Sequence, residues 1–401
     1  MPVVVLVGTV DTKALEYGFL RDRIREHGVE VLLVDAGVYE PRLEPDVSRH
    51  DVARAGGADA TSLAAAGDRG AAVTAMARGA AEVVLRLHRE GRLDAVAALG
   101  GSGGSSIATA AMRALPVGVP KLMVSTLASG DTRPYVGAVD VTMMYSVVDV
   151  SGVNSVSARI MANAAAAIAG MARATMPQLE QKPLVAATMF GVTTPCVTRA
   201  RERLEELGYE VLVFHATGTG GQSMEALVRG GYLTGVLDAT TTELADELVG
   251  GVLSAGPERL EAAGAAGVPQ VVSLGALDMV NFGPRETVPE GFAERNLYVH
   301  NPTVTLMRTT PAECAELGRE VGRKLSAATG PTVLFVPLGG ISAIAGEGQP
   351  FHDAAADEAL LAGLRETLDG VEVHELEAHI NDPAFAVAMA DRLHELIGAA
   401  A

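Results

Sequence analysis

The sequence predicts an α/β protein with two similar domains, each built on a doubly wound parallel sheet. Apolar, β-rich runs alternate with helical patterns along the 401 residues, which is typical of a parallel sheet covered on both faces. This length suits two domains, and a hydrophobic content of 48% is ample for their cores. Each half also opens in the same order: apolar strand, glycine-containing turn, helix, glycine, apolar strand.

The first half contains the clearer elements. Residues 13–27 form a predicted helix, because Asp11 and Thr12 offer an N-terminal cap and Gly28 ends it in the usual way. Two prolines and a Gly-Gly pair make 36–57 a predicted loop. Strands are predicted at 3–7, 29–34, 95–99, 120–125 and near 139–143, further helices at 70–90, 105–114 and 153–174, and a second loop at 126–137.

A linker is predicted at residues 177–183, where two prolines bracket Gln, Glu and Lys. It separates a first domain at 1–178 from a second domain at 184–401, in which the strand–helix rhythm starts again. Strands of the second domain are predicted at 184–189, 210–215, 235–237, 271–273, 332–336 and 371–375, with helices between them.

Composition excludes several classes of protein. The formal charge is −18, from 31 basic and 49 acidic residues, and no run of cations could track a nucleic-acid backbone. No apolar stretch reaches the roughly 18 residues of a membrane span. The start of the chain lacks the basic region and cleavage site of a signal peptide, and the only cysteines, Cys196 and Cys314, are far apart. We therefore expect a cytoplasmic protein that binds neither nucleic acid nor membrane.

The strongest local signal is a glycine-rich run between a predicted strand and helix, at residues 99–106 (Leu-Gly-Gly-Ser-Gly-Gly-Ser-Ser). Glycines let an anion approach backbone N–H groups, and a helix N-terminus adds unpaired donors and partial positive charge. The predicted phosphate ligands are Gly101, Ser102, Gly103, Gly104 and Ser105. No Lys-Ser/Thr pair follows, so the run is not a Walker A loop. The alternative is a tight turn that binds nothing.

Other turns at the same sheet edge are expected to contribute, because ligands of open parallel sheets bind beyond the carboxyl ends of the strands. After the first strand, Lys13 could contact phosphate and Asp11 could hold Mg²⁺; alternatively, Asp11 only caps a helix and Lys13 is a solvated cation. After the second strand, the turn Ala36, Gly37 and Val38 occupies the place of a ribose or base, with Asp35 as a ribose acceptor.

The second half has its own polar residues at predicted strand ends. His215, Asp238, Asp278 and His379 could assemble a general acid/base pair. The run 215–221 (His-Ala-Thr-Gly-Thr-Gly-Gly) could form a second anion cradle. The alternative is that the aspartates cap helices and the histidines bond to turns. No ligand spacing such as HxxxH or CxxC is present, so no metal site is predicted.

Several blocks of the chain resemble one family almost from end to end. They are residues 6–13, 99–105, 125–130, 146–149, 189–197, 214–218, 275–284 and 379–383. The chain is similar to the family of the tomato tobamovirus-resistance protein, an inhibitor of viral replication, and its uncharacterised bacterial relatives.

The resemblance implies two Rossmann-like domains, an ATP site in the first, and a homodimer. Carried over, the phosphate loop falls on residues 101–104 and the second turn on residues 36–38. In that turn the plant member has hydroxyl side chains, whereas Ala36 and Gly37 offer only backbone. Viral inhibition is not expected to transfer.

Three functions follow as hypotheses. The first is an ATP-binding protein of unknown reaction, with the need for Mg²⁺ left open. The second is an enzyme that acts on a phosphorylated or carboxylated small molecule between the domains, with His215, Asp238, Asp278 and His379 as acid/base groups. The third is a sugar-binding or regulatory module without turnover.

Overall fold

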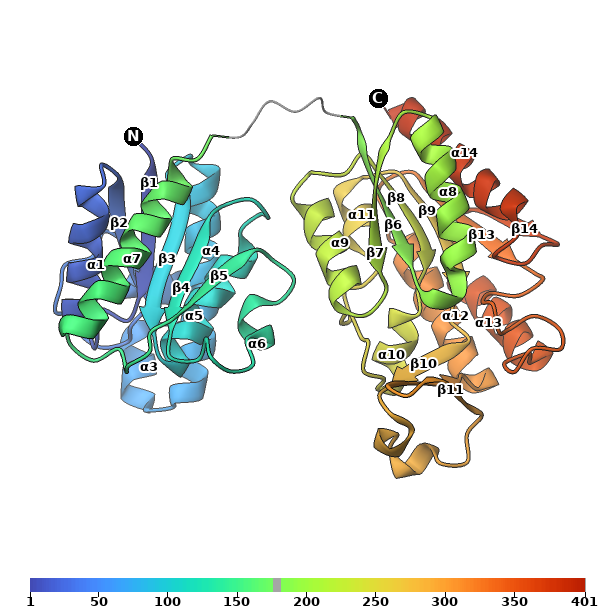
Figure 1. The fold of residues 1–401 in the computed structure, drawn as a ribbon, viewed down its shortest axis with the longest axis horizontal. Coiled ribbons are helices and arrows are strands. Elements are labelled where there is room, and N and C mark those ends of the chain that lie inside the picture. The colour runs from blue at the N-terminus through green and yellow to red at the C-terminus, as the bar shows by residue number, and fades with distance from the viewer. Residues whose placement is uncertain (176–181, 401) are drawn as a thin grey trace. The chain divides into compact units, whose positions relative to one another are not determined.

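A computed structural model describes residues 1–175 and 182–400 and divides the chain into two compact units, Met1–Gln178 and Leu179–Ala401 (Figure 1). The predicted linker at 177–183 lies largely outside the described residues. Within the described residues, no helix combines the length and apolar content needed to cross a bilayer.

The first unit is built on a five-stranded parallel sheet with the order β2-β1-β3-β4-β5. Its strands are β1 (Val3–Gly8), β2 (Glu30–Asp35), β3 (Ala95–Gly100), β4 (Lys121–Ser125) and β5 (Val141–Tyr145). Apolar residues on both faces of these strands are buried, as expected for a sheet covered on both sides. The order runs outward in both directions from β1, which makes the sheet doubly wound.

Helices cover the two faces of this sheet separately (Figure 1). Val4 and Leu6 of β1 pack against α1 and α7, whereas Val5 and Val7 pack against α2, α4 and α5. The helices of this unit are α1 (Ala14–Glu26), α2 (Arg49–Ala55), α3 (Ala60–Ala66), α4 (Arg69–Arg89), α5 (Ser102–Ala114), α6 (Arg133–Val136) and α7 (Ser155–Ala172). The pleat of each strand thus sends alternate side chains into two cores.

Three predictions for this unit were wrong in detail. The loop predicted at 126–137 contains the short helix α6. Residues 36–57 are not a loop throughout, because they contain α2, whose N-cap Ser48 accepts a hydrogen bond from the Asp51 N–H. The helix predicted from 105 begins at Ser102. Serine and glycine have low helix propensity, which displaced the predicted start by one turn.

The second unit repeats the topology with one strand added. Its six-stranded parallel sheet has the order β14-β13-β9-β8-β6-β7. The strands are β6 (Leu184–Met189), β7 (Glu210–His215), β8 (Gly235–Thr240), β9 (Gln270–Gly275), β13 (Thr332–Pro337) and β14 (Glu372–Leu376). Read from β7, this is the order of the first sheet with β14 appended. Both units are doubly wound Rossmann-like domains, as the sequence predicts.

The faces of the second sheet also have separate covers. Helices α8 and α14 pack on one face, and α9–α13 lie on the other. The helices are α8 (Thr194–Glu206), α9 (Thr219–Arg229), α10 (Glu243–Val249), α11 (Ala262–Ala266), α12 (Pro311–Ser326), α13 (Ala354–Thr367) and α14 (Pro383–Ala400), with short 3₁₀ turns η1 (Gly191–Thr193), η2 (Arg285–Thr287) and η3 (Glu290–Phe292).

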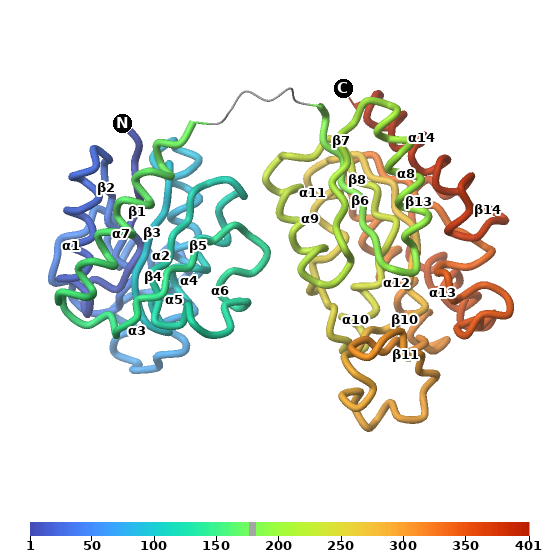
Figure 2. The backbone as a smooth tube through the Cα atoms, viewed as in Figure 1, coloured from blue at the N-terminus to red at the C-terminus, as the bar shows by residue number. Residues whose placement is uncertain are grey.

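An antiparallel sheet interrupts the second unit, and the sequence did not predict it. Strands β10 (Met279–Phe282), β11 (Leu297–Asn301) and β12 (Val304–Arg308) pair in the order β10-β12-β11. The insert lies at the carboxyl end of the main sheet (Figure 2).

Candidate functional site

A cavity of about 570 Å³ lies in the first domain, at the carboxyl ends of its central strands. Its wall comes from the turns after β1, β2 and β3 and from α3, α4 and α5. Strands β1 and β3 are neighbours in the sheet, but their following helices, α1 and α5, cover opposite faces. This is the topological switch point, where open α/β sheets bind ligands.

The glycine run forms the N-terminus of α5 and lines the cavity. Gly101 is the N-cap, and Ser102, Gly103 and Gly104 form the first turn. The N–H groups of this turn have no partner within the helix and carry its partial positive charge. A Cβ on Gly103 would lie 3.4 Å from Nη2 of Arg69, on the cavity side of the helix. The arrangement therefore presents backbone donors to an anion.

Ser105 does not share this role. Its side chain is fully buried, its Oγ lies 2.7 Å from Oγ of Ser125, and its backbone N–H donates to the Gly101 carbonyl. The Ser106 hydroxyl donates to the Ser102 carbonyl. The hydroxyl predicted at 105 thus joins α5 to β4, whereas Ser102 lines the cavity.

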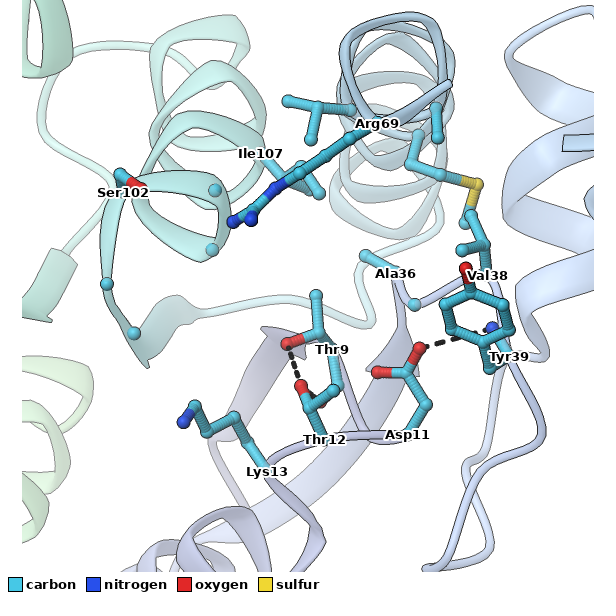
Figure 3. Close-up of a pocket in the computed structure, with 18 of the residues that line it drawn as sticks. Thr9, Asp11, Thr12, Lys13, Ala36, Val38, Tyr39, Arg69, Ser102 and Ile107 are labelled. Carbon is cyan, nitrogen blue, oxygen red and sulfur yellow. Dashed lines mark hydrogen bonds between the residues drawn. The ribbon is translucent and has the colours of Figure 1, made fainter. Parts of the chain in front are cut away.

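Two cations face the same space. Lys13 follows β1, and Arg69 is the first residue of α4; both line the cavity. Figure 3 shows the Arg69 side chain reaching toward the first turn of α5. In residues 1–175 and 182–400, neither side chain has an acidic group within ion-pair distance. Arg69 was not predicted from the sequence, because only the packing of α4 beside α5 brings it to the glycine run.

Two buried carboxylates hold the turn after β2. Asp35 is fully buried, and its Oδ1 accepts hydrogen bonds from the N–H groups of Val10 (3.2 Å) and Gly37 (2.9 Å). Asp11 is 8% exposed, and its Oδ2 accepts from the Tyr39 N–H at 3.1 Å (Figure 3). Burial raises the pKa of Asp35 to about 6. Asp35 therefore positions the turn instead of facing the cavity as a ribose acceptor.

Gly37 is needed for this close approach. A Cβ at this position would lie 2.7 Å from Cγ of Asp11, inside the van der Waals limit. With Ala36 and Val38 it lines the cavity, as do Asp11 and Lys13. All nucleotide-contacting positions expected from the sequence, except Ser105 and Asp35, therefore line one cavity.

The turns after β1 and β3, which line the cavity, begin where these two strands separate. Their pairing ends at Leu6 and Ala97, and the Tyr17 hydroxyl bridges the gap beyond it. That oxygen lies 2.8 Å from the carbonyls of Val7 and Leu99 and accepts from the Leu99 N–H at 3.1 Å. The ring occupies the place of a Cβ on the last residue of β1, which is a glycine.

Apart from Thr9, Thr12 and Asp68, most of the remaining wall is apolar. Its side chains are Ala36, Val38, Leu63, Ala72, Val73, Met76 and Ile107, with Tyr39 beside them. Asp149 also reaches the cavity, from the segment after β5. The cavity thus combines an apolar part with a polar part around the glycine run, as binding sites for small molecules commonly do.

In the second domain, Asp238 belongs to a buried ion cluster. Arg259 is buried, and its guanidinium contacts Asp238 at 2.5 and 2.7 Å and Glu243 at 2.6 Å. Thr188 donates a further hydrogen bond to Asp238 at 2.7 Å. Asp238 is 1% exposed, so this carboxylate is a structural partner of Arg259.

The anion cradle expected at 215–221 is filled by the chain itself. Oε1 of Glu243 accepts hydrogen bonds from the N–H groups of Gly218 (2.7 Å) and Gly221 (3.0 Å) at the start of α9. A Cβ on Gly221 would lie 2.2 Å from Oε2 of Glu243, so the glycine is required by this contact. The donors predicted for this cradle are present, but the anion that they bind is the carboxylate of Glu243 from the same domain.

Asp278 and His379 both lie against Ser342. The Ser342 hydroxyl donates to Asp278 at 2.8 Å, and Nε2 of His379 lies 2.9 Å from the Ser342 carbonyl. Nδ1 of His379 accepts from the Asn381 N–H, so both ring nitrogens are engaged. Burial raises the pKa of Asp278 to about 6. His215 is exposed at the end of β7, and Asp238 lies in the separate ion cluster.

The chain matches one protein family along both domains. Residues 2–177 match the N-terminal domain, and residues 182–397 the C-terminal domain, of the uncharacterised protein family UPF0261. A UPF0261 protein of Clostridium tetani (strain Massachusetts / E88) is 55% identical over 394 residues, covering 97% of this chain and 98% of that protein.

The tomato relative is longer. The ToMV resistance protein Tm-1(GCR237) of Solanum lycopersicum is 40% identical over 420 residues, which is 98% of this chain but 56% of that protein. Among solved structures, MurG of Acinetobacter baumannii is 11% identical, with 98% of this chain and 99% of that chain covered at a TM-score of 0.22. This score is too low to carry any property across. The two matched domains and the relatives in bacteria and tomato show that the chain belongs to the UPF0261 family.

Proposed function

We propose that the first domain binds a nucleotide, with ATP as the leading candidate, and that residues 101–104 contact its phosphates. The observation that carries the proposal is the N-terminus of α5, which opens with glycines into a cavity at the switch point and faces two cations without ion-pair partners among the described residues. Donors of a helix N-terminus and flexible cations are the groups that proteins use to hold phosphates. The volume of about 570 Å³ is within the range of small-molecule sites.

The orientation of the nucleotide follows from the two parts of the cavity. The phosphates would lie between the glycine run, Arg69 and Lys13, and the nucleoside along the turn 36–38 and the apolar wall. Mg²⁺ would be held mainly by the phosphates, since this ion usually takes one or two carboxylates from the protein. Asp11 and Asp149 are the carboxylates that fit, and Oδ1 of Asp11 is buried without a partner among the described residues.

The proposal is tested by calorimetric titration of the full chain with ATP, with and without Mg²⁺. Gly103→Val should abolish binding, because the branched side chain would occupy the space where the phosphates lie. The matched control is Gly170→Val in α7, since a Cβ at that exposed position meets nothing within 4 Å. An affinity unchanged in Gly103→Val would contradict the proposed site.

Phosphate release in the same samples distinguishes binding from turnover. Because both ring nitrogens of His379 are engaged within the second domain, we expect His379→Ala to leave nucleotide affinity and any phosphate release unchanged. Turnover that is lost in His379→Ala while binding persists would instead favour an enzyme that uses this histidine.

A further inference from the structure

We infer that this site selects nucleotides by the number of their phosphates and tolerates different bases. The inference rests on the proposed nucleotide site and concerns its ligand class. Its basis is the uneven distribution of hydrogen-bonding groups in the cavity, which gather around the glycine run and are scarce along the wall that would receive a base.

The turn after β2 has used most of its donors internally. The Ala36 N–H donates to the Gly8 carbonyl (2.8 Å), the Gly37 N–H to Asp35, and the Tyr39 N–H to Asp11. Three of the four N–H groups at 36–39 are thus committed. A backbone turn reads the acceptor atoms of a base with such donors, and this turn has few left.

One carbonyl of the turn is also engaged. Nη1 of Arg49 donates to the Val38 carbonyl at 3.0 Å. Arg49 is itself buried, so this contact fixes the turn from the side of α2. The carboxylates of Asp11 and Asp35 and the guanidinium of Arg49 therefore make the turn rigid while removing it from base recognition.

Apart from Asp11, whose Oδ1 is buried, the side chains beside the turn cannot read a base edge either. Leu63, Ala72, Val73, Met76 and Ile107 carry no donor or acceptor. Tyr39 is 56% exposed and is the one aromatic residue in the described lining. Stacking on an aromatic ring is tolerant of base identity, because every base has a π face. Apolar walls discriminate weakly between ligands of similar size.

At the opposite end of the cavity, the strength of binding should depend on the charge of the ligand. The first turn of α5, Arg69 and Lys13 can each take further oxygens as phosphates are added. Hydrogen bonds from charged donors to phosphate are about twice as strong as neutral ones. Affinity should therefore rise from nucleoside monophosphate to triphosphate.

The experiment is a set of calorimetric titrations of the full chain at fixed ionic strength and Mg²⁺. ATP, GTP, CTP and UTP should bind with affinities within about fivefold of one another, since the apolar wall distinguishes them poorly. ADP and AMP should be progressively weaker, with a loss of at least about thirtyfold from ATP to AMP. Inorganic tripolyphosphate should compete with ATP.

Variants separate the two parts of the site. Arg69→Ala should reduce the ATP-to-AMP ratio by about tenfold. The matched control is Arg54→Ala, an exposed arginine of α2 that does not line the cavity. Tyr39→Ala should weaken all four triphosphates by the same factor.

The outcomes distinguish this inference from the function on which it rests. If ATP binds and GTP or CTP is weaker by more than about fiftyfold, a factor beyond what an apolar wall supplies, base tolerance is overturned and the nucleotide site stands. Equal affinities for AMP and ATP would overturn selection by phosphate number. If no nucleotide binds, the proposed function itself fails.

Discussion

The two domains share a topology and a strand register, yet differ at the edge where ligands bind. Val4 pairs with Ala95 in the first sheet, and Val185 pairs with Gly235 at the same place in the second. After the third strand, the first domain continues with Gly-Ser-Gly-Gly, whereas the second continues with Thr-Thr-Glu. The first edge holds an open cavity; at the second, Glu243 fills the N-terminus of α9.

In both domains this topology creates anion-binding sites, whether or not a ligand occupies them. Helix N-termini gather at the carboxyl edge of both sheets, and their donors must be satisfied. In the second domain the chain supplies a carboxylate and Arg259 stabilises it. In the first domain the corresponding side chain is missing, because Gly103 occupies the position of Glu243 when the two registers are aligned.

The largest loss of stability is expected from removing Arg259, the cation that pairs with the buried carboxylates at the carboxyl edge of the second sheet. Arg259→Met would leave the carboxylates of Asp238 and Glu243 buried without compensation, at a cost of about 3–5 kcal/mol. Amide hydrogen exchange in β8 and β9 would measure the loss. Arg229→Met is the control, because this half-exposed arginine should cost about 1 kcal/mol or less. Equal exchange in the two variants would show that the cluster is not what stabilises this edge.

The second prediction concerns a substitution that makes the first domain resemble the second. Gly103→Glu would place a carboxylate beside the donors proposed for phosphate and weaken ATP binding by at least about a hundredfold, or roughly 2.7 kcal/mol. A glutamate in the first turn of α5 should not destabilise the helix. Gly103→Gln is the uncharged control of equal size; its side chain also enters the space of the phosphates, so it should weaken binding in calorimetry too, but less than Gly103→Glu. If both variants bind alike, sterics and not charge determine the effect.

The third prediction concerns the pH dependence of the second domain. Burial raises the pKa of Asp246 to about 7, in a site where its carboxylate accepts from Leu253 and Asn281. The folded protein therefore takes up this proton at a pH where the unfolded chain stays ionised. Stability should rise as the pH falls from about 8 toward about 4, by a few kcal/mol at most.

The measurement is the difference in unfolding free energy of the second domain between wild type and Asp246→Asn across this range. The amide cannot titrate, so the variant should lack this component of the pH dependence. Parallel curves for the two proteins would contradict the raised pKa.

The smallest effect distinguishes two serines of the glycine run. Ser105→Ala should leave ATP affinity within about twofold and cost about 1 kcal/mol of stability, because its hydroxyl bonds to Ser125 inside the domain. Ser102→Ala, at an exposed position of the cavity wall, should leave stability unchanged. Calorimetry and thermal unfolding of both variants test this. A large loss of ATP affinity in Ser105→Ala would place its hydroxyl in the site.

Much of the fold could be predicted from local patterns. Buried parallel strands are nearly continuous apolar runs, and each was located to within a few residues. The antiparallel strands β10, β11 and β12 escaped because they are short and carry polar residues such as Asn281 and Asn301. Their pairing depends on contacts that no single segment encodes.

The candidate site was predicted where the chemistry is local and missed where it depends on tertiary packing. Glycines before a helix are visible in sequence, and they do line the cavity. Arg69 lies 34 residues before Gly103, and nothing near it in sequence indicates a phosphate ligand. Likewise the cradle at 215–221 looked open, because its anion comes from Glu243 on a later helix.

The phenol that bridges the ends of β1 and β3 has a kinetic consequence. Tyr17 fixes the ends of the two strands from within the domain, so the turns that follow them and line the cavity are held in place before any ligand enters. A receptor already shaped in this way has no reorganisation step to slow capture. The association rate should then be set by diffusion and charge. Differences in affinity among ligands should therefore come from their dissociation rates.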